Sequence, residues 1–124
     1  MGEQDNVERA QRGYAAFGAG DAAGAMENIA DDIEWITPGN SAISGTVQGK
    51  QALGEHWGRL AEKGLKANPQ YWFADGDKVV ALVQVTIGDE TFDSADVMTF
   101  RDGKMVKWQS AGDTAAMERI FGSK

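Results

Sequence analysis

The stretch FDSADVMTF, Phe92 to Phe100, alternates between two faces in the way that a half-buried β-strand does. One face carries the large apolar side chains of Phe92, Met98 and Phe100, so this face is expected to be buried. Asp96 stands at its centre. Because an isolated buried charge is costly, this carboxylate must be paired, neutralised or solvated by a cavity. The pattern therefore predicts a strand that borders a core, with the carboxylate of Asp96 on its buried face.

The rest of the chain predicts helices first and strands later. Apolar residues recur at helical spacing in three segments, residues 6–17, 22–29 and 50–63. Alternating or apolar runs predict five strands, at residues 33–37, 65–74, 78–87, 91–101 and 104–111. Residues 40–49 are interpreted as a loop, and a last short helix is expected after Asp113.

Local signals refine this order. Asp102-Gly103 is a strong signal for a two-residue β-hairpin turn. Pro69 indicates that its strand lies at a sheet edge or contains a bulge, because proline cannot donate to a strand ladder. Helices followed by a strand meander are typical of an α+β fold rather than of alternating βαβ units. We therefore expect a curved antiparallel sheet wrapped on the N-terminal helices, with room for a ligand cavity between the layers.

The composition limits the function. The chain has 124 residues, 42% hydrophobic and 25% charged, which fits a single domain over residues 1–124. A net charge of −7 argues against nucleic acid and anionic membranes as partners. There is no cysteine and His56 is the one histidine, which excludes thiolate chemistry, disulfides and Cys/His zinc sites; no metal site is predicted. A polar N-terminus and the lack of a long apolar run make the cytoplasm the expected compartment.

Several motifs, taken in order, resemble a known family. They are Gly20-Asp21, Ile29 to Trp35, Pro38-Gly39, Gly49 to Ala52, Asp96 to Lys104 and Asp113 to Ala116. Together they resemble the SnoaL-like and ketosteroid isomerase-like group of the nuclear transport factor 2-like superfamily. The resemblance covers nearly the whole chain. It implies a cone-shaped, cystatin-like α+β roll, an apolar pocket for a small molecule, and a homodimer formed through the outer face of the sheet.

The resemblance carries over to single residues only in part. Asp96 falls at the position of the oxyanion-hole aspartic acid of ketosteroid isomerases, where an apolar site keeps the acid protonated. Thr37 falls where those enzymes have their general-base aspartate, and threonine cannot take that role. Tyr14 is one residue out of register with their oxyanion-hole tyrosine, whose position falls at or beside Gly13. Steroid isomerisation by that mechanism is therefore not expected.

Asp96 and His56 are the candidate catalytic residues, as a proton-transfer pair across the predicted cavity. The alternatives are a structurally hydrogen-bonded acid for Asp96 and a core or rim histidine for His56. The candidate ligand-binding residues are Tyr14, Trp35, Thr37, Trp57, Ser94, Met98, Trp108 and Ser110. Asp113 is interpreted as a helix cap, with a second pocket carboxylate as the alternative. Arg101 is expected on the opposite strand face from Asp96.

Two functions remain open. The first is a cofactor-free isomerase, dehydratase or polyketide cyclase-like enzyme that acts on an apolar carbonyl compound, with proton transfer at Asp96. The second is a ligand-binding or dimerisation module of the same fold without catalysis, which the missing base at Thr37 favours. A protein-transport adaptor has little support, because nothing in the sequence marks an interface for such a partner.

Overall fold

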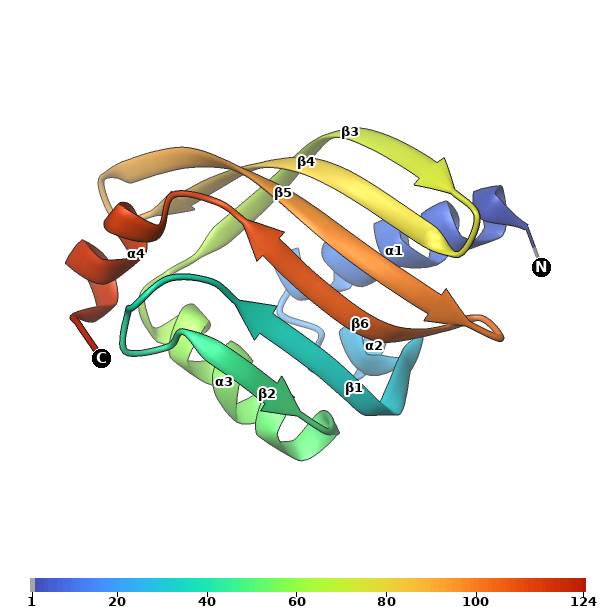
Figure 1. Cartoon of the computed structure of the whole chain (residues 1–124), viewed down its shortest axis with the longest axis horizontal. Helices are drawn as coiled ribbons and strands as arrows, with labels where there is room; N and C mark the ends of the chain where they lie inside the picture. Colours follow the sequence, from blue (N-terminus) through green and yellow to red (C-terminus); the bar gives the residue numbers. More distant parts are fainter. Residues whose placement is uncertain (1) are drawn as a thin grey trace.

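The computed structural model describes residues 2–124 and contains six strands and four helices in that range (Figure 1). The helices are α1 (Glu3–Gly18), α2 (Ala22–Met26), α3 (Lys50–Glu62) and α4 (Thr114–Phe121). The strands are β1 (Ile29–Thr37), β2 (Gly45–Gln48), β3 (Lys66–Asp75), β4 (Lys78–Ile87), β5 (Glu90–Arg101) and β6 (Lys104–Ala111). The α+β class is confirmed, with the strands in one curved sheet of order β2-β1-β6-β5-β4-β3.

The meander β3 to β6 follows the sequence pattern closely. Along β5, the residues from Ser94 to Phe100 alternate between buried and half-buried positions, with Asp96 on the buried face. The β5–β6 hairpin turns at Asp102 and Gly103, which have φ angles of 52° and 79°, as a type I′ turn requires at both central residues. The ladder slips between Pro69 and Tyr71 on β3, which is also an edge strand. Both expectations for Pro69 are therefore confirmed.

Two features of the sheet differ from the expectation. Gly45–Gln48, in the segment interpreted as loop, forms β2 and pairs antiparallel with β1 at the sheet edge. A four-residue edge strand is too short to show a period in the sequence. In addition, β1 runs parallel to β6, so the sheet is mixed rather than wholly antiparallel.

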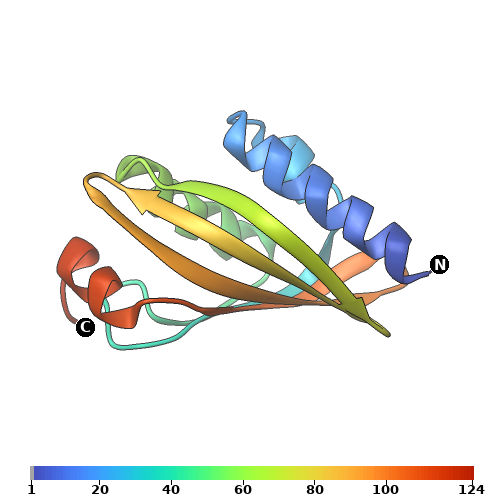
Figure 2. The same ribbon diagram turned by 90° about the horizontal axis from the view of Figure 1, so that it is seen from above.

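The helices α1, α2 and α3 cover one face of the sheet, and α4 lies at the end of the sheet (Figure 2). The contacts of α1 are with β3 and β4, and those of α3 are with β1 and β2. The first helix begins at Glu3, earlier than expected, because Gly2 serves as its N-cap and donates to the Asp5 carboxylate. The second helix ends at Met26, so Ile29 belongs to β1 and not to a helix. No helix within residues 2–124 is both long and apolar enough to span a membrane.

The core lies between the helices and the inner face of the sheet. Side chains with almost no exposed surface come from both layers: Ile33, Leu53, Val79, Val83 and Met98. Leu53 and Trp57 of α3 belong to the same cluster as Ile33 and Trp35 of β1. Burial of these side chains fixes α3 over β1, and this position decides where His56 lies.

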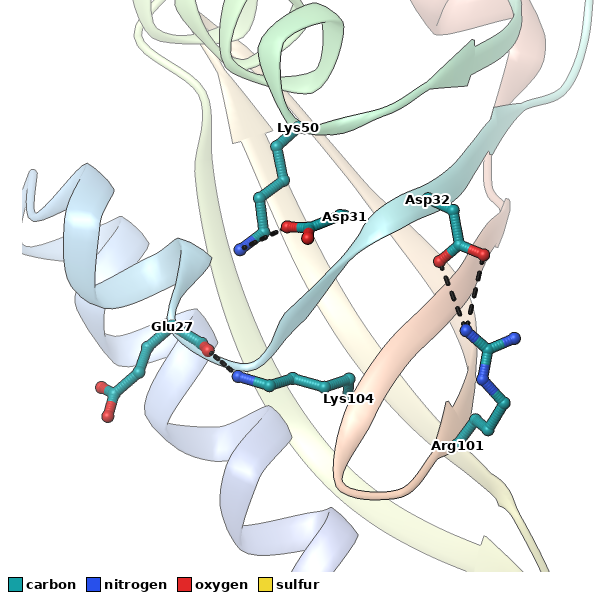
Figure 3. A network of polar contacts seen from close by, with 6 residues as sticks. All are labelled: Glu27, Asp31, Asp32, Lys50, Arg101 and Lys104. Atoms are coloured by element: carbon teal, nitrogen blue, oxygen red, sulfur yellow. Dashed lines mark hydrogen bonds and ion pairs between the residues drawn. The ribbon is translucent and has the colours of Figure 1, made fainter.

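Polar contacts link the start of β1 and the residues just before it to α3 and to the β5–β6 hairpin (Figure 3). Lys50 at the start of α3 pairs with Asp31 at 3.6 Å, and Arg101 pairs with Asp32 at 3.4 Å. Lys104 Nζ donates to the Glu27 carbonyl at 2.7 Å. Asp31 and Asp32 are exposed and lie at an irregularity in β1. Arg101 is confirmed on the outer side of the sheet, away from Asp96.

Candidate functional site

A cavity of about 130 Å³ lies between the helices and the sheet. Its wall is mostly apolar and draws on all four described helices and on five of the six strands. Asp96 is in this wall, as are His56 on α3 and Tyr14 on α1. The two residues predicted as a proton-transfer pair therefore share one cavity. A volume of this size is close to that which holds a single benzene ring in other proteins.

Asp96 has two strand neighbours and two hydrogen-bond donors. It stands in register with Ser110 of β6 on one side and Ala81 of β4 on the other. Its Oδ2 accepts a hydrogen bond from the Tyr14 hydroxyl at 2.5 Å, and its Oδ1 accepts one from Ser94 Oγ at 2.9 Å. Both oxygens are thus engaged, and each retains a lone pair for a further partner. With 4% of its surface exposed, the carboxyl belongs to the interior.

The surroundings of Asp96 act on its pKa in opposite directions. Burial raises the pKa, because a charged carboxylate loses water, and the hydrogen bonds from Tyr14 and Ser94 lower it. Burial has the larger effect, and the pKa is raised to about 6. The pKa of Tyr14 is raised well above its ordinary value, first by burial and then by the nearby Asp96 charge. Asp96 can therefore change its protonation state near neutral pH while Tyr14 stays a hydrogen-bond donor.

Two further hydrogen bonds extend this group. Trp108 Nε1 donates to the Tyr14 hydroxyl at 3.2 Å, and Ser94 Oγ and Ser110 Oγ are 3.0 Å apart. Trp72 meets the Tyr14 ring edge-to-face, with centroids 5.4 Å apart. These contacts fix Tyr14 and Ser94 in the positions from which they reach Asp96.

His56 is buried on the inner side of α3, with 4% of its surface exposed. Its pKa is lowered, first by burial and then by the positive charge of Arg59. The imidazole is therefore neutral at pH 7, with one N–H donor and one acceptor nitrogen. Within residues 2–124, neither His56 nor the buried Thr37 forms a side-chain hydrogen bond to the protein. Both polar groups are in the cavity wall, where a ligand oxygen can meet them.

Tryptophan rings form a flat part of the wall. Trp35 of β1 stacks on Trp108 of β6 with centroids 3.9 Å apart and planes 8° from parallel. Trp57 of α3 meets Trp35 edge-to-face at 5.6 Å. Among the described residues, Trp35 Nε1 is the one buried side-chain nitrogen or oxygen without a hydrogen-bond partner. A flat apolar molecule fits a wall of this kind.

The structure brings most of the predicted site residues together. The cavity wall includes Tyr14, Trp35, Thr37, His56, Trp57, Ser94, Asp96, Trp108 and Ser110. Met98 is the exception and corrects the prediction. It is on the buried face of β5, but it stands beside Val79 of β4 and is packed on all sides in the core, outside the cavity wall.

Sequence reasoning missed other parts of the wall. Phe17 of α1, Phe92 of β5 and Met117 of α4 line the cavity. Phe92 could have been found, since it shares a face with Asp96. Asp113 lies in the wall as well, but its Oδ1 accepts from the Ala116 backbone at 2.9 Å, so its interpretation as a helix cap is confirmed.

The described residues contain no cluster of three or more His, Cys, Asp or Glu that could hold a metal ion. The polar side chains in the wall can transfer protons and form hydrogen bonds. Asp96 can take or give a proton, and neutral His56 can do either through its two nitrogens.

Comparisons with known proteins agree with the fold. Residues 10–108 match the family described as SnoaL-like domain. Bal32a, from a soil-derived mobile gene cassette, is 27% identical, with a TM-score of 0.89 over 96% of this chain and 98% of that chain. An NTF2-like protein from Burkholderia xenovorans is 28% identical, with a TM-score of 0.80 over 98% of each chain. TerC, co-crystallised with polyporic acid, is 26% identical, with a TM-score of 0.83 over 96% and 99%. No curated protein sequence matches the chain.

Proposed function

The chain belongs to the SnoaL-like domain family within the nuclear transport factor 2-like superfamily, and from this we propose that it binds a small, flat, apolar carbonyl compound and transfers a proton of that ligand at Asp96. One observation carries the proposal. Asp96 is a buried carboxyl on the wall of an apolar cavity, held by Tyr14 and Ser94, with its pKa raised to about 6. Groups that must exchange protons near neutral pH are tuned in this way.

The ligand class follows from the rest of the wall. The stacked Trp35 and Trp108 rings suit a flat ring system, and the cavity volume encloses about one ring of it. The hydroxyl of Thr37 and the imidazole of His56 supply hydrogen bonds for a carbonyl oxygen. Proton transfer from carbon to a carboxylate needs no cofactor, so the reaction class is isomerisation, dehydration or aldol-type cyclisation.

Binding is tested by tryptophan fluorescence, with 2-tetralone and polyporic acid as probes. 2-Tetralone is a flat ketone with acidic protons, and polyporic acid was co-crystallised with TerC. We expect saturable quenching, because three tryptophans line the cavity. Ala67→Leu narrows the cavity and is expected to weaken binding about tenfold, or about 1.4 kcal/mol. The exposed Gln11→Glu on α1 is the control. Linear, non-saturable quenching, or equal affinity in Ala67→Leu, would contradict the proposal.

A second candidate is a ligand-binding module without catalysis. It is favoured by Thr37, which stands where related isomerases carry a base, and by His56, which no described residue orients by a hydrogen bond. The same cavity would then bind the ligand without moving a proton. Loss of binding in Ala67→Leu, together with no proton exchange in the wild type, would select this function.

The proposal includes a homodimer through the outer face of the sheet. Tyr71 and Phe73 of β3 are 63% and 56% exposed, and Leu82 of β4, opposite Tyr71, is 39% exposed. These three side chains point away from the helices, because Ala81 and Val83 on the other face of β4 are buried. An apolar patch on a sheet face is typical of an interface.

The dimer is tested by light scattering after size exclusion. The wild type is expected at twice the mass of the chain, and the double variant Phe73→Glu, Leu82→Glu at the mass of one chain, because two charges per protomer would be buried in the interface. Gln11→Glu on the helical side is expected to stay dimeric. A monomeric wild type at tens of micromolar would remove the dimer from the proposal without affecting the cavity.

A further inference from the structure

In each hydrogen bond around Asp96, the donor and the acceptor can be assigned from the chemistry of the side chains. The indole nitrogen of Trp108 can only donate, so the Tyr14 oxygen accepts from it at 3.2 Å. The single hydrogen of the Tyr14 hydroxyl is then used toward Asp96 Oδ2 at 2.5 Å. This first chain runs from Trp108 through Tyr14 and ends at the carboxylate.

Counting hydroxyl hydrogens also assigns the donors in the second chain of hydrogen bonds. Ser94 has one hydroxyl hydrogen, which it donates to Asp96 Oδ1 at 2.9 Å. Its contact with Ser110 at 3.0 Å therefore has Ser110 as the donor. Two chains of donors thus converge on the two oxygens of Asp96, and both begin on β6, at residues two positions apart on one strand face.

The ionised carboxylate of Asp96 can accept the last hydrogen bond of both chains without any change in their donors. A protonated Asp96 has a hydrogen of its own to donate, but the lines from its two oxygens to Tyr14 and Ser94 already hold the hydroxyl hydrogens of these two residues. Protonation therefore requires that one chain reverses or that the new hydrogen points into the cavity. In each chain the outer donor also polarises the inner hydroxyl and makes it a stronger donor.

We propose that Trp108 and Ser110 are positioning residues that hold Asp96 as a hydrogen-bond acceptor, so that Asp96 takes a proton from the ligand rather than donating one to it. The proposal rests on proton transfer at Asp96 as the proposed function. It differs from what the resemblance to ketosteroid isomerases implies, where the matching acid is kept protonated.

The step balances within the cavity. The carboxylate of Asp96 takes the proton from the carbon next to the ligand carbonyl, the C–H electron pair becomes the C=C bond of an enolate, and the carbonyl oxygen gains the charge. Thr37 or the N–H of neutral His56 donates to that oxygen. Return of the proton from Asp96 to the same carbon regenerates the carboxylate and the starting ketone, and return to the γ-carbon of a ligand with a conjugated C=C releases the isomer.

The test measures the pKa of Asp96 by ¹³C NMR of the side-chain carboxyl groups, in full-length variants without ligand. The Asp96 signal is identified by its loss in Asp96→Asn. We expect Trp108→Phe and Ser110→Ala each to raise the measured pKa of Asp96 by about half a unit, a roughly threefold change in ionisation constant, because each weakens one charge-assisted donor. Ser110→Thr restores the hydroxyl and is expected to return the wild-type value.

A matched control distinguishes the loss of a hydrogen bond from a change in ring packing as the cause of a shift in the pKa of Asp96. Trp35→Phe makes the same chemical change in the ring stacked on Trp108, but its Nε1 has no hydrogen-bond partner among the described residues, so the pKa of Asp96 should not move. The other titratable groups of the described wall, Arg9, Tyr14, His56 and Asp113, are the same in all these variants.

Two results would overturn the inference. The first is an unchanged pKa in both Trp108→Phe and Ser110→Ala. The second is an equal shift in Trp35→Phe and Trp108→Phe, which would assign the effect to burial. Either result leaves the proposed function intact as long as Asp96→Asn still abolishes proton exchange on a bound ketone; loss of that dependence would instead remove the proposed function itself.

Discussion

The Asp96→Asn variant is expected to exchange the α-protons of 2-tetralone for deuterium about 100- to 10,000-fold more slowly than the wild type, the range that general acid–base catalysis contributes. Asparagine has nearly the same shape as aspartate, but its amide cannot take a proton at neutral pH. The Tyr14 and Ser94 hydroxyls can rotate to bond the amide, so the fold and the cavity should remain. Exchange is followed by ¹H NMR in D₂O at fixed protein concentration.

Asp93→Asn is the matched control for this experiment. Asp93 lies on the same strand as Asp96, but it is exposed on the opposite face, so the same change should leave the exchange rate unaltered. Binding of 2-tetralone to Asp96→Asn is measured in parallel by fluorescence. Equal exchange rates in Asp96→Asn and wild type, with ligand bound in both, would show that Asp96 is not the proton-transfer group.

Asp96→Asn is also expected to stabilise the protein at neutral pH. The carboxyl has a pKa of about 6 in the fold against 3.8 when unperturbed, because burial disfavours its charge. For an acid with a raised pKa, the protonated form favours folding. This contribution is fully present below pH 3.8 and is lost as the pH rises through 6, about 3 kcal/mol in all. Asparagine stays neutral and avoids the loss.

The measurement is urea unfolding of both proteins from pH 4 to pH 8, taken as the difference in unfolding free energy. The difference cancels the opposite pH dependence from His56, whose lowered pKa makes the fold less stable as the pH falls. It should grow in favour of Asp96→Asn by up to about 3 kcal/mol between pH 4 and pH 8. A difference that does not change with pH would mean that Asp96 has an ordinary pKa. A buried group that lowers the stability of the fold in this way is typical of functional sites.

Much of the fold could be predicted because its signals are local. The alternation of β4 and β5, the Asp102-Gly103 turn and the Asp113 cap each act within a few residues, and each is found as expected. The errors come from elements without a local signal. The four residues of β2 have no readable period, and the parallel pairing of β1 with β6 is a long-range choice made by the tertiary fold.

The candidate site could be predicted as a set of residues but not as a geometry. The position of Asp96 followed from strand alternation alone. Tyr14 was placed out of register by motif comparison, yet its hydroxyl reaches Asp96, because the packing of α1 on β3 and β4 decides where a long side chain ends. Met98 shows the reverse case. Alternation places it on the correct face, but which part of a buried face borders a cavity depends on how the helices lie above it.

The pH dependence of deuterium exchange in the wild type tests the central claim most directly, namely that Asp96 takes a proton from a ligand in the cavity. The rate for 2-tetralone, corrected for the protein-free rate at each pH, is measured from pH 4.5 to pH 8. A base must be ionised to act, so we predict a rate that rises with pH, has its midpoint near the pKa of Asp96 at about 6, and then stays level. A rate that falls through this range, or that does not depend on pH, would contradict the account.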